Sequence, residues 1–370
     1  PEQRVALASS TRLEWILADL GIMCAGAATT TVYPQTNAEE SAYILSDSES
    51  RVLIAEDAAQ LAKAKEKRAE LPELTHVVVI DAAGADTAED WILTLDELER
   101  RGAARLEKEP QLIKERVGAL TKDQLATLIY TSGTTGRPKG CVLTHANLHA
   151  EAANTVELLH PIFKEVTGQT ASTLLFLPLA HILGRTIQIS CLLARIEIGH
   201  FPSIRPDELR PALKSFRPTF LVGVPYLFEK IHDTGRATAE RIGRGASFER
   251  AHRLAVRFGA AHLERFLGRG KGPTLGLWAG WALYDLLVYR RVRGELGGRL
   301  RYAISGGSPL ESDLNLFFYA AGIMVYEGYG LTETAAPSHS NPPDNPKQQC
   351  LGIPFVGTDA RVIDPDTLQE

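Results

Sequence analysis

Hydrophobic positions along the chain alternate between strand-like and helix-like spacing from the first residues onward. Val5–Ala8 is a short apolar run typical of a strand, and the apolar residues between Leu13 and Leu20 recur at helical spacing. The same alternation predicts strands at Thr29–Tyr33, Arg51–Ala55 and His76–Ile80, and helices from the Asn37/Glu40 capping pattern onward and at Ala58–Leu71. We therefore expect an α/β fold in which helices cover a sheet.

The pattern continues through the second half of the chain. Residues 84–119 are more polar and predict a surface helix, and Asn147 is expected to cap a helix that reaches about Leu159. Strands are then predicted at Thr173–Leu177, Ile196–His200, Phe220–Val224, Leu300–Ser305 and Met324–Glu327, with helices at Ile182–Leu193, Pro206–Phe216 and Pro309–Ala321. This arrangement indicates two helix-covered βαβα sheet subdomains, roughly 1–170 and 171–345.

Composition is that of an ordinary globular protein. The chain has 370 residues, of which 44% are hydrophobic and 23% charged, and its net charge of −5 gives no indication of nucleic-acid binding. Cys24, Cys141, Cys191 and Cys350 form no CxxC pair, which favours reduced thiols and a cytoplasmic location over a zinc site. The longest apolar runs are interrupted by charged residues and fall short of a membrane span.

Residues 230–301 differ from the rest of the chain. This segment holds fifteen Lys/Arg against six Asp/Glu, interleaved with apolar residues at helical spacing and followed by four aromatic residues. One interpretation is a helical insertion that packs by its aromatic face. The other is a basic amphipathic surface that contacts anionic membrane or delivers a lipid substrate.

The stretch from Leu128 to His145, LIYTSGTTGRPKGCVLTH, carries the strongest chemical signal. An apolar strand leads into a loop whose glycines and exposed N–H groups suit phosphate oxygens. It is not a Walker A loop, because Lys139 lies between Pro138 and Gly140 and a second strand-like run follows. The expected phosphate-binding residues are Thr131, Ser132, Gly133, Thr134, Thr135, Gly136 and Lys139.

This string closely resembles the phosphate-binding signature of the adenylate-forming superfamily, which includes acyl-CoA synthetases, luciferases and peptide-synthetase adenylation domains. Ser305–Leu310 (SGGSPL) resembles that family's adenine-side turn, and Glu327–Thr334 (EGYGLTET) resembles its Tyr-Gly-Leu-Thr-Glu motif. The resemblance implies the family's N-terminal domain over 1–350, with 351–370 beginning a small β-barrel-like third subdomain. The family's Tyr-x-Thr-Gly-Asp segment, hinge and C-terminal lid domain with its lysine do not occur, so we expect a poorly active N-terminal fragment.

The resemblance also implies chemistry. A carboxylic acid would react with ATP to give an acyl-adenylate and pyrophosphate, and coenzyme A would then take the acyl group. Thr131 and Glu333 would lie beside Mg²⁺, Thr332 would contact phosphate, and His181 would border the acyl carboxylate. The expected catalytic residues are Lys139, His181, Thr332 and Glu333. The adenine side is implied at Gly306, Gly307, Ser308, Glu327, Gly328, Tyr329 and Gly330, and the acyl side at His181, Gly223 and Tyr226.

Each of these residues also has a purely structural interpretation. Glu333 could be a cap or surface carboxylate, Tyr329 a core residue, and His181 a packing residue, while Gly223 and Tyr226 could simply mark a strand end and its turn. The basic, aromatic insertion before Ser305 resembles long-chain members of the family more than luciferases or peptide-synthetase domains, so the resemblance implies a long-chain fatty acid–CoA ligase. The alternatives are an enzyme that activates another carboxylic acid, such as a medium-chain or aryl acid, and a catalytically incomplete nucleotide- or acyl-binding module. The partners expected are fatty acid, ATP and coenzyme A, with peripheral contact at the inner membrane face as an option; the oligomeric state stays open, a homodimer included.

Overall fold

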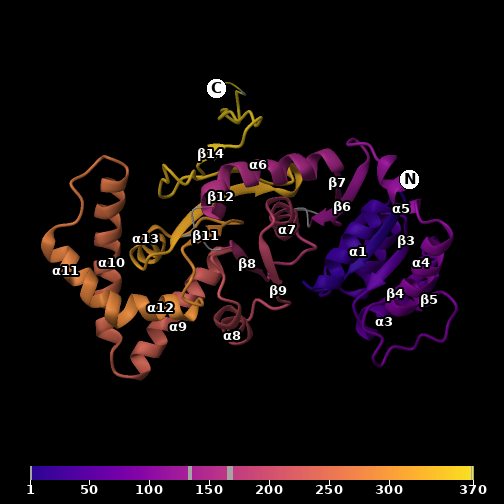
Figure 1. Cartoon of the computed structure of the whole chain (residues 1–370), viewed down its shortest axis with the longest axis horizontal. Helices are drawn as coiled ribbons and strands as arrows, with labels where there is room; N and C mark the ends of the chain where they lie inside the picture. The colour runs from indigo at the N-terminus through magenta and orange to yellow at the C-terminus, as the bar shows by residue number, and fades with distance from the viewer. Residues whose placement is uncertain (1, 132–135, 165–169, 368, 370) are drawn as a thin grey trace. The chain divides into compact units, whose positions relative to one another are not determined.

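The computed structural model describes residues 2–131, 136–164, 170–367 and 369. By its internal contacts the chain divides into two compact units. Unit 1 comprises Pro1–Glu151, Phe176–Ile189 and Thr332–Ala335, and unit 2 comprises Ala152–Leu175, Ser190–Leu331 and Ala336–Glu370. Each unit contains a sheet with helices around it, which confirms the predicted α/β class (Figure 1).

Unit 1 is built on a seven-stranded sheet with the order β5-β4-β3-β1-β2-β6-β7. Its strands are parallel except for β7, which pairs antiparallel with β6. The strands are β1 (Arg4–Ala8), β2 (Ala28–Val32), β3 (Ser50–Ala55), β4 (His76–Val79), β5 (Ile92–Thr94), β6 (Leu125–Thr131) and β7 (Lys139–Thr144). The accompanying helices are α1 (Leu13–Cys24), α2 (Ala38–Asp47), α3 (Ala58–Glu66), η1 (Arg68–Glu70), α4 (Leu95–Lys108) and α5 (Leu112–Gly118).

Local sequence explains most of these boundaries. The side chain of Asn37 accepts a hydrogen bond of 2.8 Å from the backbone N–H of Glu40, which is the cap predicted for α2. The prediction for Asn147 was wrong, because α6 (His145–Lys164) begins two residues earlier. Instead, the Thr144 hydroxyl accepts a hydrogen bond from Asn147 N–H. The polar region 84–119 contains two helices, α4 and α5, where one was expected, and also β5, whose three residues are too few to show a strand periodicity.

Unit 2 contains a five-stranded sheet with the order β10-β11-β12-β13-β14 and a separate parallel pair, β8 and β9. β10, β11 and β12 are parallel, whereas β13 and β14 run antiparallel to their neighbours. The strands are β8 (Ser172–Leu175), β9 (Glu197–His200), β10 (Phe220–Gly223), β11 (Tyr302–Ser305), β12 (Met324–Leu331), β13 (Ala336–Ser340) and β14 (Ile353–Pro354). In the described residues from 341 to 367, β14 is the only strand.

The helices of the second half include the basic segment identified from the sequence. They are α7 (Ile182–Ala194), α8 (Pro206–Phe216), α9 (Pro225–Arg241), α10 (Gly245–Phe266), α11 (Leu275–Tyr284), a π-helical segment η2 (Asp285–Tyr289), α12 (Arg290–Glu295) and α13 (Ser312–Ala320). A last 3-10 turn, η3 (Thr332–Thr334), separates β12 from β13. α10 packs against α9, α11 and α13, and its Phe248, Phe258 and Leu263 are buried. None of the helices among the described residues is long and apolar enough to cross a membrane.

Candidate functional site

The phosphate-loop candidate lies at the end of the β6–β7 hairpin of unit 1. Thr131, the last residue of β6, pairs with Lys139, the first residue of β7, so backbone pairing closes the loop at its base. Tyr130 pairs with Gly140, and a Cβ on Gly140 would lie 3.1 Å from the tyrosine ring. The predicted contacts Ser132, Gly133, Thr134 and Thr135 lie outside the described residues. Gly136 has a φ of +106°, which an L side chain rarely adopts.

Helix α2 contacts the chain on both sides of this loop. The Tyr130 hydroxyl donates a hydrogen bond of 2.7 Å to Asp47 Oδ2, and the Tyr43 hydroxyl donates one of 3.1 Å to the carbonyl oxygen of Pro138. Burial, and then the Asp47 carboxylate, raise the pKa of Tyr130. The Arg137 guanidinium lies 5.1 Å from the centroid of the Tyr43 ring. α2 therefore fixes the entry and the exit of the loop.

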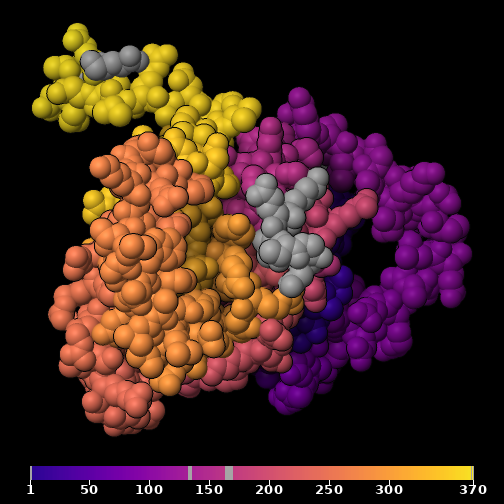
Figure 2. All heavy atoms as spheres, turned by 60° about the vertical axis from the view of Figure 1, so that its left-hand side comes forward, coloured from indigo at the N-terminus to yellow at the C-terminus, as the bar shows by residue number. Residues whose placement is uncertain are grey.

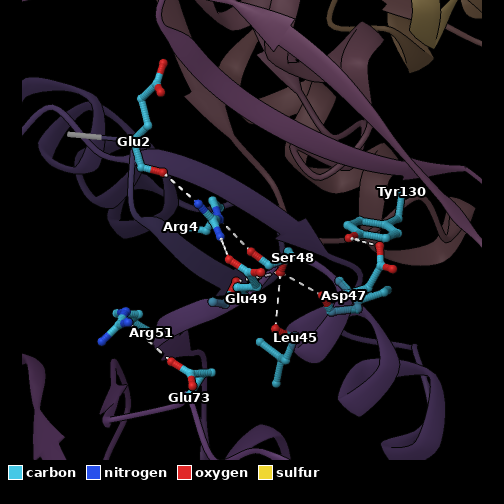
Figure 3. A network of polar contacts seen from close by, with 11 residues as sticks. Glu2, Arg4, Leu45, Asp47, Ser48, Glu49, Arg51, Glu73 and Tyr130 are labelled. Carbon is cyan, nitrogen blue, oxygen red and sulfur yellow. Dashed lines mark hydrogen bonds and ion pairs between the residues drawn. The ribbon is translucent and has the colours of Figure 1, made fainter.

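The C-terminal end of α2 is itself anchored to the sheet. Figure 3 shows Tyr130 directed at Asp47, with Ser48 and Glu49 next along the chain. Arg4 of β1 donates a hydrogen bond of 2.6 Å from Nε to the Ser48 carbonyl oxygen and forms an ion pair with Glu49. None of these contacts has a local sequence signal, because the partners are far apart in the chain.

A cavity of about 360 Å³ opens within unit 1 beside the hairpin. It brings together Thr131, His181 and Thr332, three predicted site residues from three separate stretches of sequence. The complete lining is Thr31, Tyr33, Thr36, Glu40, Ile44, Ile129, Tyr130, Thr131, Pro138, His181 and Thr332. Its hydroxyl groups and one carboxylate give it a polar character, and Tyr33, Thr36 and Glu40 are members that sequence analysis did not identify.

His181 lies in the turn that leads into α7. Its Nδ1 accepts a hydrogen bond of 3.1 Å from Leu183 N–H, so the neutral ring carries its proton on Nε2. The ring is open to the cavity, yet the surrounding protein atoms desolvate it and lower its pKa, which keeps it neutral at pH 7. A Cβ on Gly184 would lie 2.5 Å from the Pro178 carbonyl oxygen, so the tight turn that presents His181 requires this glycine.

Glu333 lies in η3, which packs against β7 in unit 1. The pKa of Cys141 in β7 is raised by burial and further by the charge of Glu333, so the carboxylate lies close to the strand that begins with Lys139. The Thr186 hydroxyl of α7 donates a hydrogen bond of 3.0 Å to the Ala335 carbonyl oxygen and holds the end of this segment. Thr332 and Glu333 are thereby fixed next to the hairpin.

Predicted site residues from three parallel strands are neighbours in the unit 2 sheet. Gly223, Ser305 and Glu327 are paired neighbours at or near the carboxyl ends of the parallel strands β10, β11 and β12. Ligands of α/β proteins commonly bind at such an edge. The Gly306 N–H donates a hydrogen bond of 3.1 Å to the Gly223 carbonyl oxygen, and Gly307, with a φ of +86°, turns the chain toward exposed Ser308.

Glu327 has a role that sequence analysis missed. Its side chain is only 8% exposed, and its Oε1 accepts a hydrogen bond of 3.1 Å from Leu310 N–H. Burial raises the pKa of this carboxyl group, while the backbone hydrogen bonds oppose the shift. The Glu327 carbonyl oxygen accepts a hydrogen bond from Asn341 N–H. Glu327 therefore shapes the Ser305–Leu310 turn from the neighbouring strand.

Tyr329 is not a core residue, since 42% of it is exposed. Its ring meets His339 of β13 at a centroid distance of 6.2 Å in an edge-on arrangement. A Cβ on Gly330 would lie 1.9 Å from the Ala336 carbonyl oxygen, so the close approach of β13 alone requires a glycine there. Tyr226, at the start of α9, is also exposed, and Lys230 Nζ lies 5.3 Å from its ring centroid.

These features define a chain of the adenylate-forming type, and comparison with known proteins gives the same result. The chain belongs to the AMP-binding enzyme family, whose model matches residues 1–370. It is 38% identical over 365 residues to the long-chain-fatty-acid–CoA ligase FadD15 of Mycobacterium bovis. The match covers 99% of this chain and 57% of that protein, so the chain spans just over half the length of this relative.

Two solved structures show the same fold. The anthranilate CoA ligase AuaEII in complex with anthranoyl-AMP superposes on 100% of this chain and 57% of its own, with a TM-score of 0.65 and 19% identity. The N-terminal domain of FACL13 from Mycobacterium tuberculosis covers 92% of this chain and 66% of its own, with a TM-score of 0.57 and 20% identity. At these identities the likeness establishes the fold, which is that of an adenylate-forming N-terminal domain.

Proposed function

We propose that this chain is the N-terminal part of a long-chain fatty acid–CoA ligase. The complete enzyme activates a fatty acid with ATP and transfers the acyl group from the adenylate to coenzyme A. The observation that carries the proposal is the unit 1 cavity, where Thr131, His181 and Thr332 converge beside the Lys139 hairpin and Glu333. The FadD15 relative supports the substrate class.

The first reaction joins two anions, so the protein must neutralise charge and hold the attacking oxygen in line. Lys139 is exposed at the loop exit, with its backbone fixed by pairing to Thr131. Its ammonium group and the loop N–H groups would bind the β- and γ-phosphates, and Thr332 would add a hydroxyl donor. The hydrogen bonds from α2 would keep this loop in a binding geometry before ATP arrives.

Mg²⁺ fits the donors that unit 1 offers. Thr131, at the end of β6, supplies a hydroxyl, and Glu333 supplies a carboxylate from η3, which packs against β7 of the same hairpin. Magnesium prefers oxygen ligands and commonly takes one or two carboxylates, with water and substrate phosphates completing the shell. Thr131 and Glu333 would hold the ion, which would neutralise phosphate charge when bound.

His181 would orient the acyl carboxylate and need not act as a base. A fatty acid is already ionised at neutral pH, so no proton has to be removed before attack. The lowered pKa of His181 keeps the ring neutral. Its Nδ1 accepts the hydrogen bond from Leu183 N–H, so the Nε2–H takes no part in that bond. That N–H could donate to the carboxylate oxygen that does not react.

The two glycine-rich motifs of unit 2 support an adenine-binding site in that unit. Gly306 and Gly307 would let a flat base approach bare backbone, and Tyr329 offers an exposed aromatic face. Ser308, Gly328 and Gly330 belong to the same two motifs. The buried Glu327 carboxylate would act indirectly, by holding the Ser305–Leu310 turn in place.

A cavity of about 490 Å³ in unit 2 supports a long apolar chain as the substrate tail. Leu209 and Leu213 of α8, Leu227 and Ile231 of α9 and Val292 of α12 contribute to its wall. A volume of this size lies in the range of small-molecule sites. On α9 the first lining residue is Leu227, which directly follows Tyr226, a residue predicted on the acyl side. The basic character of 230–301 further supports contact with an anionic membrane.

Pyrophosphate release by the full-length enzyme, measured with a panel of acids, tests this proposal. We expect release with long-chain fatty acids, dependent on ATP and Mg²⁺, and acyl-CoA formation when coenzyme A is added. Release only with medium-chain or aryl acids would assign the chain to another acid-activating enzyme. ATP binding without release for any acid would indicate a nucleotide-binding module.

A further inference from the structure

The unit 1 cavity contains a carboxylate that the proposed chemistry does not use. Glu40 of α2 lines the cavity, and its backbone N–H donates the capping hydrogen bond of 2.8 Å to Asn37 Oδ1. The carboxylate itself accepts no hydrogen bond from, and forms no ion pair with, the residues that the structure describes. Of the described residues that line the cavity, Glu40 alone is charged at neutral pH, because the lowered pKa of His181 keeps that ring neutral.

Three hydroxyl groups line the cavity together with Glu40. They belong to Thr31, at the end of β2, and to Tyr33 and Thr36 in the turn that follows. Thr31 is only 2% exposed, and its Oγ1 has no hydrogen-bond partner in the part of the chain that the structure describes. Burial raises the pKa of Tyr33 to about 12, so its hydroxyl stays protonated at neutral pH. Because buried polar groups are normally hydrogen-bonded, an unpaired one in a cavity wall indicates a ligand.

The turn between β2 and α2 is held in place from α3. Lys63 Nζ donates hydrogen bonds of 2.8 Å to the Pro34 carbonyl oxygen and 2.7 Å to the Thr36 carbonyl oxygen. This ammonium group therefore binds backbone and leaves the Glu40 charge uncompensated. In Figure 2, which colours the chain by residue number, β2 and α2 belong to its indigo part.

The Glu40 charge has the wrong sign for the ligand that the proposed function places beside it. Thr131 and Thr332 line the same cavity and are proposed to contact the phosphates of ATP. A bare carboxylate there would repel the triphosphate, since like charges repel strongly where protein excludes water. Lys139 is exposed and is not among the lining residues. The cavity therefore requires a cation between Glu40 and the phosphates.

We propose that this cavity binds a second divalent cation, held by the Glu40 carboxylate and by the hydroxyl groups of Thr31, Tyr33 and Thr36. It is distinct from the ion assigned to Thr131 and Glu333. Mg²⁺ fits these donors, because it takes oxygen ligands and is commonly bound by one or two carboxylates, substrate phosphates and water. The inference rests on the proposed function, since the phosphates of ATP would complete the shell.

A cation beside Glu40 would serve the leaving group of the first reaction. When the acyl carboxylate oxygen attacks the α-phosphorus, a new phosphorus–oxygen bond forms and the bond to the bridging oxygen breaks. The electron pair of the broken bond leaves with pyrophosphate. Two ions would share the charge that develops there, as in other sites where paired cations stabilise a displaced oxygen. Glu40 would thereby promote the departure of pyrophosphate.

A count of bound Mn²⁺ ions tests the second site without any turnover. Mn²⁺ replaces Mg²⁺ at oxygen sites, and electron paramagnetic resonance measures the ion that stays free. We use the 370-residue chain with an equal amount of ATP and no acid substrate. The unchanged protein should bind two ions per complex with ATP, whereas ATP without protein should bind one. Glu40→Gln should bind one ion.

Matched controls come from the neighbouring positions in the chain. Glu39→Gln should still bind two ions, because Glu39 is exposed and does not line the cavity. Thr31→Val should weaken the second ion by roughly tenfold or more through loss of a hydroxyl. Thr30→Val should not, because Thr30 is equally buried and its hydroxyl is likewise unpaired, but it lies on the opposite face of β2 and does not line the cavity.

Two results would overturn the inference. One is a single ion in the unchanged protein that both Glu40→Gln and Glu333→Gln lose, which would make Glu40 a ligand of the first ion. The other is a pair of ions that persists in Glu40→Gln. Calorimetry of ATP binding on the same proteins separates the two levels of the argument. A chain that binds no ATP would refute the proposed nucleotide site, whereas ATP bound with a single ion would refute only the second metal site.

Discussion

Arg185 of α7 and Asp19 of α1 form a buried ion pair with two hydrogen bonds, Nε to Oδ2 at 2.9 Å and Nη2 to Oδ1 at 2.5 Å. Their side chains are 0% and 5% exposed. The Thr29 hydroxyl donates a third hydrogen bond, of 2.6 Å, to Asp19 Oδ1. Arg185 follows His181 by one helical turn, so the pair fixes the first turn of α7 and the histidine that precedes it.

Removal of the Asp19 charge should destabilise unit 1 strongly. Asp19→Asn leaves the Arg185 charge buried without a counter-ion, and we expect the free energy of unfolding to fall by about 3–5 kcal/mol. Urea denaturation measures this loss. The control is Glu109→Gln, which breaks the exposed pair with Arg105 and should cost less than about 1 kcal/mol. Equal effects of the two changes would show that the buried pair has no special role.

Replacement of Lys139 by Ala should weaken ATP binding and leave the fold intact. The side chain is exposed and contributes little to packing, while loss of a charge-assisted phosphate contact should cost about 1.5–3 kcal/mol of binding free energy. Isothermal calorimetry with ATP measures the effect, and the equally exposed Lys122→Ala is the control. An unchanged ATP affinity in Lys139→Ala would remove Lys139 from the phosphate site.

The features that could be predicted from the sequence are those that depend on residues close together in the chain. Strand and helix periodicity predicts most elements, the spacing of Asn37 to Glu40 predicts the cap of α2, and the glycine-rich motifs predict the loop and both turns. In the sequence, Arg185 is only one of the charges that interrupt an apolar run. Its partner lies 166 residues away, and no periodicity connects them.

The same reason explains the other omissions. Tyr43 reaches Pro138 across 95 residues, and Tyr33 and Glu40 line the cavity only because β2 lies beside β6 in the sheet. Helical spacing shows that α10 has an apolar stripe but not whether a neighbouring helix covers it. These features depend on which elements pack together, which is a property of the whole fold.

Glu333→Gln should impair magnesium-dependent adenylation by the full-length enzyme. Gln keeps the size and one oxygen but loses the charge that holds the cation. Glu333 is exposed, so thermal stability should change by no more than about 0.5 kcal/mol. Pyrophosphate release over a magnesium titration is the measurement, with exposed Glu99→Gln as control. Wild-type release at every magnesium concentration would show that Glu333 does not serve the metal.

Acid should destabilise unit 2 through His232. Its ring packs at a tilt against Phe248 and edge-on against Phe317, and its Nε2 lies 3.0 Å from His252 Nδ1. Burial, and then the neighbouring His252, lower its pKa from 6.5, although Asp233 opposes the shift. The unfolded chain therefore binds a proton more readily than the folded protein, so this contribution to stability is complete above about pH 6.5 and declines as the pH falls.

Denaturation curves at pH values on either side of this transition check the sign. His232→Gln should lose less stability on acidification than the unchanged protein, because it no longer has this proton to bind. Exposed His149→Gln should retain the original pH dependence. A His232→Gln protein with the same acid sensitivity as the unchanged one would assign that sensitivity to other groups.

The unit 2 cavity can be narrowed from α9 to test whether it holds the acyl chain. Ala239 lines the cavity, and Ala239→Phe would place a ring inside it. We expect the full-length enzyme to lose activity with the longest fatty acids by about tenfold or more while retaining it with shorter ones, since an overpacked site excludes the chain end at a cost of about 1–3 kcal/mol.

Ala237→Phe is the matched control, because Ala237 lies two residues earlier on the same helix, is exposed and does not line the cavity. Activity measured over a series of saturated acids separates the two. If both variants kept the original chain-length profile, the acyl chain would have to lie elsewhere in the protein.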